Sequence, residues 1–269
     1  MLASPFMPPT TRNRRIRLDN NPLLLPRSEM ALFLDLDGTL APIAARPDMV
    51  GPDARRNLLL GDLSRALEGR VAIVSGRAIF EVDRILDGCV ACVAGLHGLE
   101  RRGADGRFQT ANVHPGLAMA LPAVRAFAIG HQAMLVEDKK LAIALHYRET
   151  PDAAEQVVDF ARQLAWTTGL KLQEGQMVVE LRSPGADKGD MVRAFMAEEP
   201  FSGRRPVFIG DDLTDEDGFA AASERNGYGI LVGPPRQTRA TSRLPDVEAV
   251  LRWLQAGIDT GVFFLPAPQ

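Results

Sequence analysis

Two carboxylates, Asp35 and Asp37, stand two positions apart at the end of an apolar run and are followed by Gly38 and Thr39. In an extended backbone, side chains two residues apart point to the same side. One carboxylate can attack phosphorus as a covalent nucleophile, while its neighbour protonates the leaving oxygen and later deprotonates water. Gly38 permits a sharp turn beside them. The alternatives are a plain strand-ending turn and a calcium loop, but the downstream oxygen ligands and closing Glu of a calcium loop are missing.

A second acidic cluster follows another apolar run. Its acids are Asp211, Asp212, Asp215 and Glu216. Carboxylates this close repel one another unless a cation or water screens them. Mg²⁺ prefers oxygen ligands, so one carboxylate from each cluster and a phosphate oxygen form a suitable set. The alternative is an acidic helix start with Thr214 as its N-cap, and both interpretations can hold together.

Two further signals concern phosphate. Ser75 and Gly76 end a third apolar run before a helical segment, where a hydroxyl and free backbone N–H groups can seat a phosphate. Lys188 begins a later helical segment and offers a compact positive charge to phosphate and nucleophile alike. Alone, these are equally an ordinary turn and a surface lysine.

The elements that must position these residues are short apolar runs that end in Gly, Asp or Ser. The runs cover residues 31–38, 71–77, 89–95, 206–212 and 228–233. Helical periodicity follows the first run, over residues 53–67. This alternation is typical of parallel strands with crossover helices, whose carboxyl ends meet at one edge of the sheet. The chemistry-bearing residues are therefore expected at a common rim.

Residues 101–183 differ in texture and predict an inserted α+β cap. Its expected parts are hairpins over 135–148 and 170–182 and helices over about 116–130 and 152–168. The catalytic core would then be discontinuous, with segments 29–100 and 184–269. Residues 1–28, rich in Pro and Arg, are expected to form a flexible lead-in.

Composition narrows the class of protein. The 269 residues are 46% apolar and 24% charged, so the chain can bury a core. The net charge of −3 gives no reason to expect a nucleic-acid or membrane partner. No apolar stretch reaches the ~18 residues that span a bilayer. Cys89 and Cys92 lie in an apolar run and favour a reducing cytoplasm over a disulfide framework or a redox motif.

Taken in chain order, these motifs resemble those of the haloacid dehalogenase superfamily of aspartate-nucleophile phosphatases. The resemblance implies that Asp35 is the nucleophile and Asp37 the general acid/base. The residues that it implies for phosphate are Ser75, Gly76 and Lys188. Those that it implies for Mg²⁺ are Asp35, Asp37 through its backbone carbonyl, and Asp211. Thr39, Asp212 and Asp215 would support them.

A closer resemblance is to the trehalose-6-phosphate phosphatase family. It rests on residues 35–48, 75–77, 95–100, 137–148, 177–182, 188–190, 210–219 and 241–254. It implies an α/β fold with a Rossmannoid parallel-sheet core, helices on both faces and an inserted cap that binds the sugar. It also implies Mg²⁺-dependent hydrolysis of trehalose 6-phosphate through an aspartyl-phosphate and functional coupling to a trehalose-6-phosphate synthase. Ser183–Pro184 departs from the family pattern, in which proline follows the basic residue directly.

The cap offers a set of polar side chains for sugar hydroxyls: Glu137, Lys139, His146, Arg148, Glu180 and Arg182. The resemblance favours Lys139, His146 and Glu180, with Arg77 and His97 as further contacts from the core. Each could equally be a solvent-facing strand or turn residue.

Two alternatives stay open. Another sugar-phosphate phosphatase or a phosphosugar mutase would share the core motifs and differ in the cap. A non-catalytic switch domain also phosphorylates an aspartate near other acids and a lysine. Asp37 and the long insert favour turnover over a switch.

Overall fold

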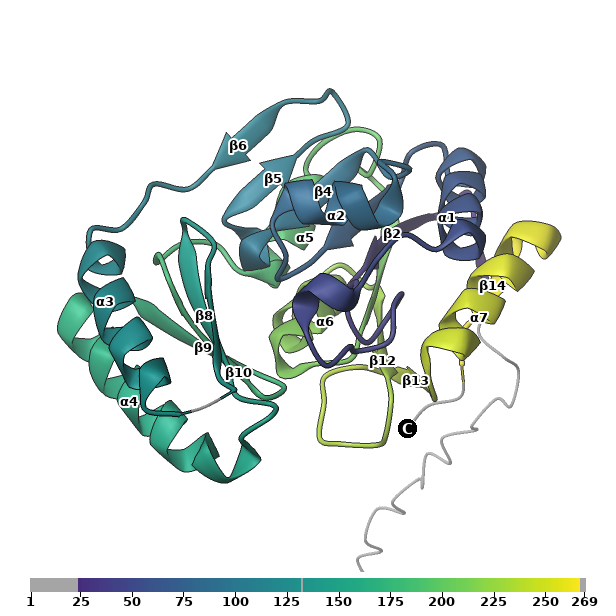
Figure 1. Ribbon diagram of the computed structural model, residues 1–269. Helices are drawn as coiled ribbons and strands as arrows, with labels where there is room; N and C mark the ends of the chain where they lie inside the picture. The colour runs from purple at the N-terminus through teal and green to yellow at the C-terminus, as the bar shows by residue number, and fades with distance from the viewer. Residues whose placement is uncertain (1–23, 132, 267–269) are drawn as a thin grey trace, which may run out of the picture.

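The computed structural model describes residues 24–131 and 133–266, and its largest element is an eight-stranded sheet (Figure 1). The strand order is β13-β12-β11-β2-β3-β4-β5-β6. The parallel strands are β2 (Met30–Leu34), β3 (Val71–Val74), β4 (Cys92–Gly95), β11 (Arg205–Gly210), β12 (Tyr228–Val232) and β13 (Ser242–Leu244). Each of the five expected apolar runs contains one of them, which confirms the α/β prediction.

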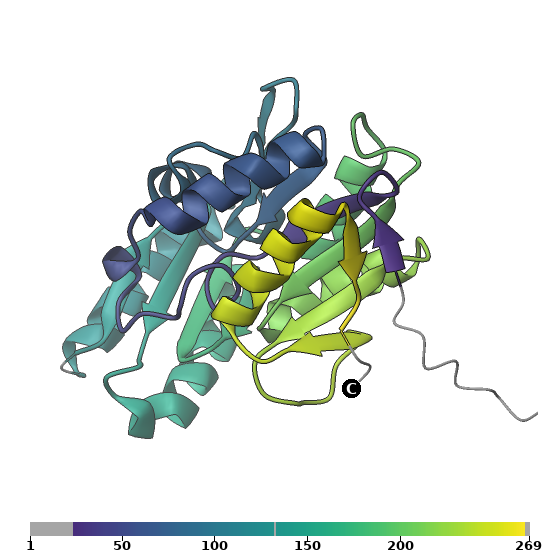
Figure 2. The same cartoon turned by 90° about the vertical axis from the view of Figure 1, so that its right-hand side faces the viewer.

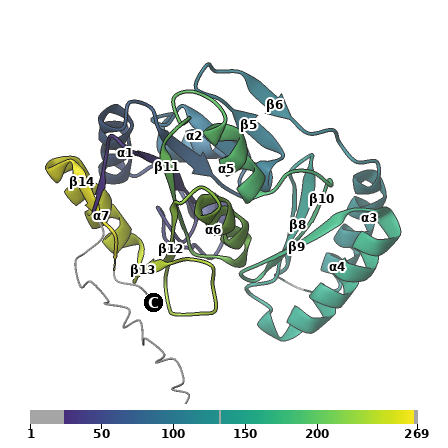
Figure 3. The ribbon, with the colours of Figure 1, turned by 180° about the vertical axis from the view of Figure 1, so that it is seen from behind.

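Helices cover both faces of this sheet. Along β2, Leu32 and Leu34 pack into one cluster with the helices of one face, and Ala31 and Phe33 pack into another on the opposite face. The first face carries α1 (Ala54–Ala66), α2 (Ile79–Leu86) and α7 (Val247–Thr260), and the second carries α5 (Lys188–Met196) and α6 (Glu216–Ser223) (Figures 2 and 3). Burial on both faces explains why the strands are continuously apolar.

A second sheet, four-stranded and antiparallel, lies beside the large sheet (Figure 1). This sheet and its two helices are here called the small module. Its strands are β7 (Leu135–Asp138), β8 (Ala142–His146), β9 (Lys171–Gly175) and β10 (Val178–Arg182), in the order β7-β8-β10-β9. Its helices, α3 (Gly116–Ile129) and α4 (Ala154–Thr168), share a separate apolar core with the sheet. Both hairpins and both helices lie where the sequence predicted them.

The expected start of the insert at residue 101 is wrong. Strands β5 (Glu100–Arg102) and β6 (Phe108–Thr110) pair antiparallel beside β4 and extend the large sheet. Because β6 is exposed, it needs no buried apolar face. The two strands are therefore rich in charged and polar residues, and their sequence is like that of a loop. The small module therefore begins after Thr110.

The expected lead-in, residues 1–28, lies mostly outside the described residues. Its last part forms β1 (Leu24–Pro26), which pairs antiparallel with β14 (Val262–Phe264). Four short 3-10 helices complete the described chain: η1 (Pro47–Met49), η2 (Leu96–Gly98), η3 (Pro151–Ala153) and η4 (Leu213–Asp215). Within residues 24–131 and 133–266, the helices are too short or too polar to cross a membrane. Cys89 and Cys92 are free thiols.

Candidate active site

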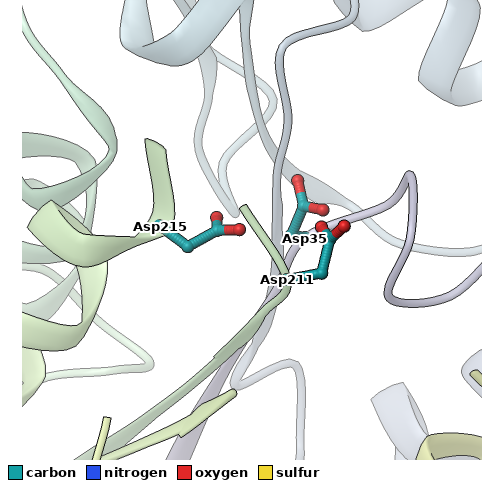
Figure 4. A group of neighbouring side chains, drawn as sticks. All are labelled: Asp35, Asp211 and Asp215. Carbon is teal, nitrogen blue, oxygen red and sulfur yellow. The ribbon is translucent and has the colours of Figure 1, made fainter. Parts of the chain in front are cut away.

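Two acids meet at the carboxyl edge of the large sheet because β2 and β11 are neighbours. The backbone N–H of Asp35 donates to the carbonyl oxygen of Ile209 at 2.9 Å, so Asp35 and Asp211 leave adjacent strands side by side. Gly38 has φ of +78°, and the carboxylate of Asp211 lies directly against it. A Cβ at this position would lie 2.1 Å from Oδ2 of Asp211, so only glycine leaves room for that carboxylate. One carboxylate oxygen from each of Asp35, Asp211 and Asp215 lies within 4.8 Å of the other two (Figure 4).

Lys188 joins this cluster from the first turn of α5. Asp187 caps the helix by accepting a hydrogen bond from the backbone N–H of Asp190 at 2.9 Å, which sets where Lys188 projects. The Nζ of Lys188 donates to Oδ1 of Asp35 at 2.8 Å and to Oδ1 of Asp215 at 2.7 Å. Lys188 and both carboxylates are buried. The predicted convergence of the four motifs on one rim is therefore observed for Asp35, Lys188 and Asp211.

The charges in this cluster do not balance. Burial, together with the charges of Asp215 and Asp37, raises the pKa of Asp35 to about 7 although Lys188 opposes the shift. Burial and repulsion from Asp35 and Asp215 raise the pKa of Asp211 to about 9. Burial disfavours the charged lysine, but the two carboxylates outweigh it and raise the pKa of Lys188. The donor set, carboxylate oxygens with a deficit of positive charge, fits a hard divalent cation.

Asp37 is not a member of this acidic cluster but pairs with Arg77. Its two carboxylate oxygens accept from Nε and Nη2 of Arg77, while Nη1 of Arg77 donates to the carbonyl oxygen of Pro47 at 3.0 Å. The sequence analysis expected Arg77 to contact sugar. In the structure its hydrogen-bond partner is Asp37, the candidate general acid/base. Ser75 is buried, and its Oγ accepts from the backbone N–H of Arg77 at 3.2 Å.

His97 follows β4 in a left-handed conformation, with φ of 55°, and its backbone N–H donates to the carbonyl oxygen of Ser75 at 3.0 Å. Its ring lies against Gly76, where a Cβ would come within 2.6 Å of Nε2. That Nε2 lies 3.3 Å from Oε2 of Glu180, and burial lowers the pKa of His97. A core residue thus meets a residue of the small module.

Lys139 makes a second contact between the core and the small module. Its Nζ donates to the carboxylate of Glu180 and to the carbonyl oxygen of Gly76, the latter at 3.2 Å. Burial disfavours the ammonium, but Glu180 and Glu137 outweigh it and raise the pKa of Lys139. Burial also disfavours the Glu180 carboxylate, but Lys139 and His97 outweigh it and lower its pKa. Lys139 and Glu180 are therefore a buried ion pair.

The remaining small-module candidates differ in placement. Nε2 of His146 lies 3.1 Å from Oε2 of Glu137, and Nη1 of Arg148 donates to the carbonyl oxygen of Ala44 in the core at 2.9 Å. Arg182, weighed as a sugar contact, is instead fully buried and donates to the carbonyl oxygen of Ala186 at 2.9 Å in the linker to Lys188. Arg182 is therefore not placed to contact sugar, because its side chain is buried against the segment that leads to Lys188.

An open cleft lies between the core and the small module. From the core it is lined by Asp35, Asp37, Gly76, Arg77, His97, Lys188 and Asp211, and from the small module by Glu137, Lys139, His146, Arg148 and Glu180. The core side of the cleft thus includes Asp35, Asp211 and Lys188, and the small-module side includes hydrogen-bonding groups suited to hydroxyls.

The loop after β11 differs from expectation in one detail. Asp212, not Thr214, caps the short helix η4, accepting from the backbone N–H of Leu213 at 2.7 Å. Thr214 lies inside that helix. Thr39 is buried beside the site, and its hydroxyl has no hydrogen-bond partner among the described residues.

Solved structures share this fold. A haloacid dehalogenase-like hydrolase from Bacteroides thetaiotaomicron superposes with a TM-score of 0.61 at 15% identity. The match covers 85% of this chain and 98% of the hydrolase chain. A trehalose-6-phosphate phosphatase related protein covers 86% and 98%, with a TM-score of 0.73 at 26% identity. The fold is therefore that of the haloacid dehalogenase-like proteins.

Sequence comparison narrows the class to a family. The trehalose-phosphatase family model matches residues 33–248, and this chain belongs to that family. The trehalose-6-phosphate phosphatase of Escherichia coli strain K12 is 38% identical over 234 residues, covering 85% of this chain and 86% of the relative. A probable trehalose-phosphate phosphatase of Sinorhizobium fredii is 39% identical over 227 residues, covering 82% and 84%.

Proposed function

We propose that this chain hydrolyses trehalose 6-phosphate to trehalose and phosphate, through an aspartyl-phosphate at Asp35 and with Mg²⁺ as cofactor. The observation that carries the proposal is the contact of Lys188 with Asp35 in a cleft that polar residues of the small module also line. The same contact gives the nucleophile a fixed direction and a buried positive charge beside it.

The chemistry divides into two steps at Asp35. A carboxylate oxygen of Asp35 bonds to phosphorus while the bond from phosphorus to the sugar oxygen breaks, and Asp37 protonates that oxygen. Water then attacks phosphorus, Asp37 accepts its proton, and the bond from phosphorus to Asp35 breaks. Lys188 offsets negative charge throughout. Mg²⁺ held by Asp35 and Asp211, with the Asp37 carbonyl as a further ligand, would add positive charge at the phosphoryl oxygens.

Phosphate and sugar would bind on opposite sides of the cleft. For the phosphoryl group we propose Lys188, with Ser75 and Gly76 forming the turn beneath it. The side chains that we propose for the sugar hydroxyls are Lys139, His146, Glu180 and His97, with Glu137 and Arg148 near them. The small module would act as a cap that encloses the sugar and excludes water. A trehalose-6-phosphate synthase, which makes this substrate, would be the functional partner.

Phosphate release from a substrate panel tests the substrate. Trehalose 6-phosphate, sucrose 6-phosphate and glucose 6-phosphate are each assayed with Mg²⁺ and with a chelator. We expect turnover of trehalose 6-phosphate that the chelator abolishes. Higher kcat/KM for glucose 6-phosphate would reject the proposed substrate, and full activity in chelator would reject the metal.

The variant Asp35→Asn tests the covalent step. It keeps the shape of the side chain but removes the nucleophilic charge, so phosphate release should stop while the thermal midpoint changes little. Asp62→Asn, on the exposed part of α1, serves as the control for loss of one carboxylate. Near-normal turnover by Asp35→Asn would exclude the aspartyl-phosphate.

A further inference from the structure

Arg236 lies on the loop between β12 and β13, outside every motif that the sequence singled out. Its guanidinium reaches back to the loop after β11. Nη2 donates to the carbonyl oxygens of Asp212 at 2.8 Å and of Asp211 at 3.4 Å. Nη1 donates to the carboxylate of Glu216 and to the carbonyl oxygen of Gln237, the latter at 3.1 Å. The loop after β11, residues 211–216, is here called the acidic loop. The side chain of Arg236 thus holds two consecutive peptide groups of this loop.

The opposite side of the acidic loop is held by groups of the active site. The backbone N–H of Asp212 donates to Oδ2 of Asp215 at 3.0 Å, and the other oxygen of Asp215 accepts from Lys188. Without Arg236, the carbonyls of Asp211 and Asp212 would lose their only side-chain donors within the described residues. The loop is therefore fixed between Lys188 on the inside and Arg236 on the outside.

Glu216 keeps the guanidinium of Arg236 in this orientation. Its side chain is only 19% exposed, and Oε2 also accepts from the backbone N–H of Arg239 at 2.7 Å. Arg239 contributes its backbone to this arrangement, while its own side chain is exposed. Arg236 and Arg239 are thus two arginines of the same loop, of which only the first binds the acidic loop through its side chain.

We infer that Arg236 is a positioning residue for the divalent cation, acting through Asp211. By fixing the peptide groups on the carboxyl side of Asp211, it sets the direction in which that carboxylate leaves the sheet edge. Groups that orient metal ligands in this way typically contribute about 10–100-fold to metal affinity. The inference rests on the proposed function, which places the cation at Asp35 and Asp211.

The sign of the effect separates this role from simple electrostatics. If Arg236 acted only as a nearby positive charge, removing it would reduce repulsion and tighten binding of a cation. If it orients the ligand, removing it weakens binding. Arg236→Lys keeps the charge but loses the planar fork that holds two carbonyl groups and Glu216 together, so it should weaken binding as well.

The experiment is a titration of the metal-free full chain with Mn²⁺, followed by the electron paramagnetic resonance signal of the free ion. Arg236→Met and Arg236→Lys should bind Mn²⁺ about 10–100-fold more weakly than the unmodified chain. Arg239→Met, the matched loss of one charge from the same loop, should stay within about 2-fold by the orientation argument. At saturating Mn²⁺, KM for trehalose 6-phosphate should not change in any of them.

Each outcome bears on a different statement. If the unmodified chain binds no Mn²⁺, the proposed metal site fails. If it binds Mn²⁺ and Arg236→Met binds as tightly or more tightly, the role of Arg236 is refuted and the metal site stands. Should Arg236→Met not fold, Arg236→Lys carries the test, since it keeps the charge and loses only the planar fork; unchanged Mn²⁺ affinity in that variant would equally refute the inference.

Discussion

Both carboxylate oxygens of Asp37 accept hydrogen bonds from Arg77, at 2.7 Å from Nε and 2.8 Å from Nη2. This two-point contact orients Asp37. Each carboxylate oxygen keeps a second lone pair, which can carry the proton that a leaving sugar oxygen needs. Arg77 can therefore hold Asp37 in place while Asp37 transfers a proton.

Arg77→Met should lower kcat for trehalose 6-phosphate by roughly 10²-fold, the lower end of what a general acid contributes, because Asp37 loses the group that orients it. Arg77→Lys should recover only part of this, since lysine lacks the fork that binds two oxygens. Arg84→Met, in the helix that follows Arg77 and in contact with the carbonyl of Val50, is the control. An unchanged or higher kcat in Arg77→Met would mean that Arg77 only restrains Asp37.

Gly38→Ala should abolish most activity, because the added methyl group overlaps the carboxylate of Asp211 at the expected metal site. Gly106→Ala is a matched control: both glycines have φ of +78°, but the space around Gly106 is open. Both variants should lose about 1–2 kcal/mol of stability from the left-handed backbone. Only Gly38→Ala should also lose phosphate release, and equal activity in the two variants would contradict the close approach of Asp211.

The buried pair of Lys139 and Glu180 should separate stability from activity. Lys139→Met leaves the Glu180 carboxylate buried without its main partner, at a cost of about 3–5 kcal/mol. The double variant Lys139→Met, Glu180→Leu removes both charges and should regain most of that stability. It should not regain activity, because both proposed sugar contacts are gone. Urea unfolding and KM for trehalose 6-phosphate measure the two effects; recovery of both would exclude a role in sugar binding.

The metal-free protein should lose stability as pH rises. The folded-state pKa values of Asp35, about 7, and Asp211, about 9, lie above the ordinary value near 4. Their contribution to stability is therefore fully present below about pH 4 and is lost as pH rises through 7 and then 9. Bound Mg²⁺ should remove most of this loss, because it stabilises the ionised carboxylates.

Thermal unfolding between pH 5 and pH 9, in chelator and in Mg²⁺, measures this effect. A loss of about 1 kcal/mol lowers the midpoint by roughly 2–4 °C in a protein of this size. Asp211→Asn should flatten the pH dependence in chelator and reduce the gain from Mg²⁺. The same pH dependence with and without Mg²⁺ would mean that the cation does not bind at these carboxylates.

Much of the architecture was readable from the chain. The parallel strands and the small module were predicted because apolar periodicity and turn residues are local properties. The strand-end positions of Asp35, Ser75 and Asp211 followed from the same reading, and strand-end residues of a parallel sheet must share an edge. The strands missed were β1, β5, β6, β13 and β14, each only three residues long. Of these, β6 is exposed and is defined by its pairing with β5, without a buried apolar face of its own.

The partners of the charged groups were decided only in three dimensions. Asp37 and Arg77 are 40 residues apart, and Arg236 lies 24 residues beyond Asp212, so no local pattern records either contact. Likewise, Arg182 is only two residues from Glu180 in sequence, but its guanidinium donates to the carbonyl oxygen of Ala186 in the segment that leads to Lys188. Residue type and strand position set which groups can reach the sheet edge. Which of them pair depends on distances of a few ångströms between loops that only the packed sheet and its helices bring together.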